Sequence, residues 1–149
     1  MPDKKHKKNA GFTLLELLIV MVIIGLLVAL VAPRFTGKIG ESKIKTTQTQ
    51  IEYLSSALES YYLDTGQYPS TEQGLKALIE APQGIKEKWD GPYLKKIKLP
   101  EDGWGYEFVY KGPNDADTKK LGLDYIIKSL GKDNEPGGQD ENQDLYSYK

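Results

Sequence analysis

Hydrophobic residues fill one long block near the start of the chain, and shorter periodic segments follow it. From Phe12 to Ala32 the sequence is apolar except for Thr13, Glu16 and Gly25. A helix rises about 1.5 Å per residue, so these 21 residues can cross a hydrocarbon core of about 30 Å. Four lysines precede the block: Lys4, Lys5, Lys7 and Lys8. Because basic flanks stay in the cytoplasm, the pattern predicts a single-pass membrane helix with a cytoplasmic N-terminus.

Pro33, Gly37 and Gly40 follow the apolar block. A proline inside a helix costs about 3 kcal/mol, and a glycine about 1 kcal/mol relative to alanine, so one interpretation is a helix break at the membrane surface. Helical spacing then resumes in a stripe of apolar residues, namely Ile44, Ile51, Leu54, Leu58 and Tyr61 or Tyr62. This favours one helix from about Phe12 to Leu63, bendable after Pro33, whose second half is amphipathic.

Shorter elements are expected after the helix. Asp64-Thr65-Gly66 is a helix-stop signal, and Ser70 with Gln73 has the spacing of a capping box before a short helix at Leu75–Ile79. Alternating residues at 106–110 and 123–128, separated by a polar loop at 112–120, predict two strands. The predicted fold class is therefore α+β. A long N-terminal helix packs on a small antiparallel β-sheet, and a C-terminal loop region follows.

Composition restricts the class of function. The chain has no cysteine, and its single histidine, His6, lies in the basic leader. The remaining sequence has no Gly-x-Ser-x-Gly motif and no phosphate-binding loop, which disfavours a membrane-tethered enzyme. Loss of residues 1–11 would remove four lysines and one aspartate and shift the formal charge from −1 to −4, which argues against a nucleic-acid partner. The lysines of residues 86–98 are interpreted as a solvated face, with a filament contact surface as the alternative.

The acid near the start of the apolar block belongs to a recognisable motif. Gly11-Phe12-Thr13-Leu14-Leu15-Glu16, after a basic leader and before an apolar run that ends at Pro33, resembles the class III signal of type IV pilins and type II secretion pseudopilins. An ordinary secretory signal is cut after its apolar run, not before it. The resemblance implies that a prepilin peptidase cuts between Gly11 and Phe12 and methylates the Phe12 amine. The anchor helix would then remain in the product.

Glu16 then has two interpretations. A carboxylate near the bilayer edge costs a few kcal/mol unless it lies at the headgroup level. Alternatively, the new Phe12 amine of one subunit pairs with Glu16 of another, because two charges in lipid cost less together than apart. The family resemblance implies this second role, in filament assembly.

Later motifs narrow the resemblance to the major pseudopilins of type II secretion systems. They are Tyr62–Pro69, Thr71–Leu75, Gly91–Leu94, Asp102–Gly105 and Ser129–Asp133. The resemblance implies a leader at 1–11, a transmembrane and filament-core helix at 12–33, and a periplasmic pilin-like domain at 34–149. It implies a homopolymer that works with minor pseudopilins, the prepilin peptidase, the inner-membrane secretion platform and the outer-membrane secretin to export folded proteins. A type IV pilus pilin or a minor pseudopilin is the alternative.

The end of the chain is acidic, with five acids within twelve residues: Asp133, Glu135, Asp140, Glu141 and Asp144. On composition, this segment is either a solvated disordered tail or a Ca²⁺-binding loop, and its spacing does not match an EF-hand. The family resemblance implies a Ca²⁺ site within residues 130–144. Its expected ligands are the side chains of Asp133, Asp140 and Glu141 and the backbone carbonyls of Leu130, Glu135 and Gly138.

Overall fold

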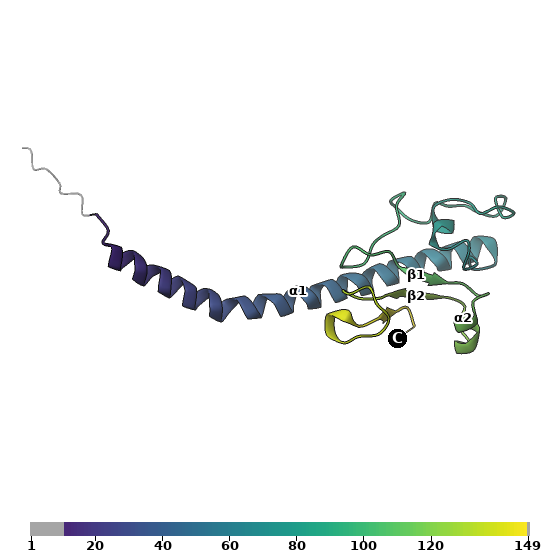
Figure 1. The fold of residues 1–149 in the computed structure, drawn as a ribbon. Coiled ribbons are helices and arrows are strands. Elements are labelled where there is room, and N and C mark those ends of the chain that lie inside the picture. Colours follow the sequence, from purple (N-terminus) through teal and green to yellow (C-terminus); the bar gives the residue numbers. More distant parts are fainter. Residues whose placement is uncertain (1–10, 149) are drawn as a thin grey trace, which may run out of the picture. The chain divides into compact units, whose positions relative to one another are not determined.

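The computed structural model describes residues 11–148, except for the side chains of residues 32–37. Helix α1 spans Leu14–Thr65 (Figure 1). It continues through Pro33, so the continuous-helix interpretation is confirmed. The basic leader, including Lys4 to Lys8, lies outside the described residues. Two compact units divide the chain, and the second begins at Ile39 and runs to the C-terminus.

The second half of α1 carries the stripe that builds the core of this second unit. Leu54, Leu58 and Tyr61 are fully buried, whereas Tyr62 is 42% exposed, so Tyr61 is the residue that continues the stripe. The helix ends where the stop signal predicts. Gly66 has a φ of 77° and donates its N–H to the carbonyl of Tyr62 at 2.8 Å, a left-handed cap that glycine adopts without strain.

The sheet contains β1 (Val109–Lys111), β2 (Ile126–Ser129) and β3 (Leu145–Tyr146), in the order β1-β2-β3 with both pairs antiparallel. Figure 1 shows β1 and β2 alongside the second half of α1. Phe108, Tyr110 and Ile127 join the α1 stripe in one hydrophobic cluster. The predicted α+β class and the antiparallel sheet are confirmed. Both predicted strands begin several residues later than expected, and β3 was not predicted.

Two short helices also differ from expectation. The capping box exists, because Gln73 Oε1 accepts from the Ser70 N–H at 2.8 Å, but the element after it is a 3₁₀ helix, η1 (Leu75–Leu78). The segment predicted as a polar loop contains α2 (Ala116–Leu121). Its signals are local: Asp115 caps the first turn, and Gly122 ends the helix in the left-handed conformation. These short-range signals outweigh the overall polarity of the segment.

Candidate functional site

The Gly11–Phe12 junction lies in an exposed, non-helical segment just before α1. Thr13 is the helix cap, since its Oγ1 accepts from the Glu16 N–H at 3.2 Å. Phe12 is 79% exposed, and a side chain added at Gly11 would meet no atom within 4 Å. The peptide bond predicted to be cut is therefore exposed and outside the helix, which begins at Leu14.

The first part of α1 is apolar on all sides. Residues Leu14–Val31 are long and apolar enough to span a membrane, and none of them is buried by the rest of the chain. Glu16 lies in the first turn, where the helix dipole favours a carboxylate. Glu16 is therefore the one charged residue of the segment Leu14–Val31, whose other side chains are apolar.

The C-terminal loop, defined as residues 130–144, consists of tight turns and a short 3₁₀ helix, η2 (Asp140–Asn142). Its left-handed backbone positions are Gly131, Asn134, Gly137, Gly138 and Asp140. Asp144 closes the loop, because its Oδ1 accepts from the Gly137 N–H at 3.1 Å and its Oδ2 accepts from the Tyr146 hydroxyl at 2.9 Å. Burial first, and then this hydrogen bond to Asp144, raises the pKa of Tyr146 to about 12.

The carboxylates of the predicted Ca²⁺ ligand set have different surroundings in the structure. Asp133 and Asp140 are exposed in the loop, and Asp133 Oδ1 accepts from the Glu135 N–H at 3.2 Å. Glu141 instead pairs with Lys132, with Oε2 and Nζ 3.0 Å apart. Within residues 11–148, no group of three or more acidic, histidine or cysteine side chains is placed to hold a metal ion. The three-carboxylate set therefore does not fit this arrangement, whereas Asp133 and Asp140 keep exposed oxygens of the kind that Ca²⁺ prefers.

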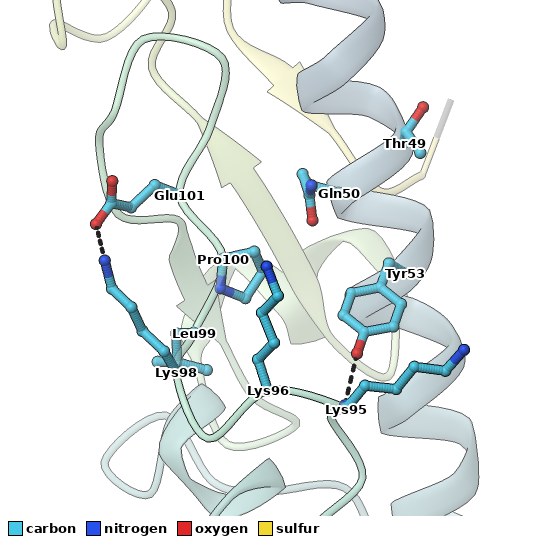
Figure 2. Close-up of a pocket in the computed structure, with 9 residues that line it drawn as sticks. All are labelled: Thr49, Gln50, Tyr53, Lys95, Lys96, Lys98, Leu99, Pro100 and Glu101. Carbon is cyan, nitrogen blue, oxygen red and sulfur yellow. Dashed lines mark hydrogen bonds and ion pairs between the residues drawn. The ribbon is translucent and has the colours of Figure 1, made fainter.

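The lysine-rich segment forms one wall of a surface groove on the second unit. The groove has a volume of about 530 Å³ and lies between α1 and residues 95–101 (Figure 2). A hydrogen bond joins the two sides of the groove, because the Tyr53 hydroxyl accepts from the Lys95 N–H at 2.9 Å. Lys98 pairs with Glu101 at 2.8 Å. All five lysines of residues 86–98 are exposed, which is compatible with a solvated face and also with a contact surface.

Sequence reasoning assigned no role to Asp102, a buried carboxylate. Its Oδ1 accepts from the N–H groups of Trp104 and Tyr106, both at 2.9 Å, and its Oδ2 accepts from the Ser129 hydroxyl at 2.6 Å. An aspartate that binds the backbone two residues ahead is a common turn device, so the Asp-Gly pair carried the signal for the turn. The long-range bond to Ser129 had no sequence signal.

Comparisons with known proteins agree with the motif at the junction. Residues 34–148 match the family model described as type II secretion system (T2SS), protein G. Residues 6–32 match the prokaryotic N-terminal methylation motif. The two matches together span nearly the whole chain.

Curated relatives and a solved structure point the same way. The chain is 38% identical over 148 residues to the type II secretion system core protein G of Pseudomonas aeruginosa, covering 97% of this chain and 98% of the relative. It is 37% identical over 147 residues to that of Vibrio cholerae, covering 97% and 95%. The crystal structure of the major pseudopilin from the type 2 secretion system of enterohaemorrhagic Escherichia coli matches with a TM-score of 0.56 and 30% identity, covering 74% of this chain and 90% of that one. The chain therefore belongs to the type II secretion system protein G family, whose members are structural pseudopilin subunits and not enzymes.

Proposed function

We propose that this chain is the major subunit that polymerises into a periplasmic pseudopilus and drives export of folded proteins across the outer membrane. The observation that carries the proposal is the methylation motif at residues 6–32, which includes the exposed apolar segment Leu14–Val31 of α1. Such a helix is satisfied equally by lipid or by copies of itself, so it can leave the bilayer for a filament without a large solvation loss. The polar unit remains outside.

Maturation would begin at the exposed Gly11–Phe12 bond. A prepilin peptidase would cut there and methylate Phe12, with the N-terminus in the cytoplasm and residues 34–149 in the periplasm. The new Phe12 amine and Glu16 of a neighbouring subunit would then pair as the anchors bundle. Minor pseudopilins, the inner-membrane platform and the outer-membrane secretin are the remaining expected partners.

A deletion of the gene tests this function. Loss of exoprotein secretion with normal surface motility is expected, and loss of motility alone would instead indicate a pilus pilin. Complementation with Gly11→Leu should fail, because a bulky residue replaces the one before the scissile bond, while Leu14→Ala serves as a nearby control. Mass spectrometry of working material should find residue 12 at the N-terminus with one added methyl group. An intact leader would overturn the proposal.

For the C-terminal loop, we propose a Ca²⁺ site held by the side chains of Asp133 and Asp140 and by the carbonyls of Leu130, Glu135 and Gly138. The ion would offset repulsion among the acids and stabilise only the ordered loop. Glu141 is left out, because its carboxylate is paired with Lys132.

Thermal unfolding of the processed protein in detergent tests the Ca²⁺ site. A 100-fold excess of Ca²⁺ over its dissociation constant contributes about 2.7 kcal/mol, and should raise the melting temperature by on the order of 10 °C over chelator. Asp133→Asn should abolish the response, whereas Asp124→Asn, an exposed acid outside the loop, should keep it. Equal melting curves with Ca²⁺ and with chelator would exclude the site.

A further inference from the structure

Glu141 lies against the start of the α1 segment that belongs to the second unit. Gly40 is buried, and a Cβ added there would lie 2.6 Å from Glu141 Cγ. The Glu141 carbonyl accepts from the Lys132 N–H at 2.9 Å, in addition to the ion pair between the two side chains. Glu141 therefore joins the two ends of the C-terminal loop and places them on Gly40.

A second connection runs through the buried Asp102, which is only 6% exposed. Asp102 Oδ2 accepts from the Ser129 hydroxyl, and Ser129 Oγ in turn accepts from the Gly131 N–H at 3.2 Å, where the C-terminal loop begins. The residue after Asp102 reaches the helix, because the Gly103 N–H donates to Thr47 Oγ1 at 2.8 Å. Thr47 is fully buried and donates to the Lys43 carbonyl at 2.9 Å.

The approach at Gly103 leaves no room for a side chain. A Cβ there would lie 2.9 Å from Lys43 Cα and would also meet the Lys43 carbonyl. The turn at 102–103 therefore packs directly on the helix backbone. Both connections end within one short stretch of α1, Gly40 to Thr47.

We propose that Glu141 and Asp102 are positioning residues of a two-point clamp that fastens the C-terminal loop to residues 40–47 of α1. The clamp sets where the folded unit begins on the helix, next to Ile39. Order in the loop and order in residues 40–47 are then thermodynamically coupled, so loosening either one loosens the other. Any unwinding that starts after Pro33 during assembly would stop at Gly40. The clamp does not depend on a metal ion or on the secretion function.

Native-state hydrogen exchange of the full-length protein in detergent, followed by mass spectrometry, measures both ends of the clamp. Glu141→Gln should speed exchange in peptides covering 40–47 and 130–144 together by about tenfold, while the core peptide 51–61 stays unchanged. Glu135→Gln makes the same charge change in the same loop and should leave residues 40–47 unaffected. Ser129→Ala should reproduce the Glu141→Gln pattern through the Asp102 connection.

Gly40→Ala raises the helix propensity of α1, so a change in helix stability alone would slow exchange. Faster exchange in this variant would therefore point to the clamp. The substitution should speed exchange at 130–144 because the new methyl group displaces Glu141, whereas Ser42→Ala on the exposed face should not. Combining Gly40→Ala with Glu141→Ala should cost less than the sum of the two changes. Loosening of the loop with unchanged exchange at 40–47, or a uniform rise in all peptides, would overturn the clamp.

Discussion

The apolar segment Leu14–Val31 and the unit that begins at Ile39 differ in how their apolar side chains are buried. Along Leu14–Val31 every residue is exposed and nearly every one is apolar, so this segment has no core of its own. From Ile39 onward, apolar residues of α1 and the sheet bury one another, and Leu54, Leu58 and Ile127 have no exposed surface. The first part depends on lipid or on other subunits, while the second folds around its own contacts.

This difference separates assembly from stability. Within the apolar segment, an apolar replacement should change neither association nor stability, whereas a substitution that places a polar group there should change how copies associate and leave the melting of the second unit unaltered. A substitution in the core should do the reverse. Glu16 is the exception within the apolar segment, because its charge gives the position a specific partner requirement that apolar contacts lack.

The largest effect is expected for Glu16→Ala. Without the carboxylate, the amine of a neighbouring Phe12 would be left unpaired in a low-dielectric bundle, a loss that corresponds to on the order of 100-fold less filament. Cleavage, methylation and membrane insertion should be normal. Filament yield by electron microscopy, with processing checked by mass spectrometry, measures this, and Val22→Ala is the control. Normal filament yield from Glu16→Ala would remove the proposed role of the acid.

The opposite result is expected for Leu58→Ala. Deleting a fully buried leucine side chain leaves a cavity and costs about 2–5 kcal/mol of unfolding free energy. Chemical denaturation should show this loss for Leu58→Ala and none for Ile23→Ala, since Ile23 is 51% exposed. Membrane insertion should be equal in both variants. If Ile23→Ala destabilised the second unit as strongly, the two parts would not be independent.

Hydrophobic patterns that extend over many residues gave the most reliable predictions from the sequence. The apolar block and the spacing from Ile51 to Leu58 predicted α1, including its passage through Pro33, because many positions contribute to one periodic signal. The choice between Tyr61 and Tyr62 was open, since both fit the spacing. It is decided by tertiary packing, because Phe108 and Tyr110 belong to the same buried cluster as Tyr61.

Short elements and tertiary contacts were less predictable. Strand β3 contains only two residues, and it pairs with β2 across a long sequence separation, with Leu145 buried opposite Ser129. Composition alone did not distinguish the acids of the C-terminal loop, yet Asp144 closes the loop and Glu141 binds Lys132. The composition gives the number of acidic residues but not the cation or N–H group that each carboxylate binds. The Ca²⁺ site therefore remains a prediction.

The smallest expected effect concerns Tyr146 and tests whether the C-terminal loop contributes to the stability of the second unit. Its pKa is raised from about 10 in the unfolded chain to about 12, so the folded state favours the protonated hydroxyl. The resulting stabilisation is fully present below pH 10 and is lost as the pH rises through 12. Tyr146→Phe lacks the bond to Asp144 and should be less stable at pH 7 by about 0.5–1 kcal/mol.

Urea unfolding at pH 7, 9.5 and 11.5 should show this difference shrinking with rising pH, because an ionised Tyr146 would face the Asp144 carboxylate at hydrogen-bond distance. Tyr148→Phe is the matched control, since that ring is tilted against Tyr146 with the ring centroids 5.0 Å apart. Contributions from the other tyrosines cancel between wild type and variant. A constant difference across the three pH values would mean that the Tyr146–Asp144 bond does not stabilise the loop, and that the loop is held by its other contacts, such as the Glu141–Lys132 ion pair.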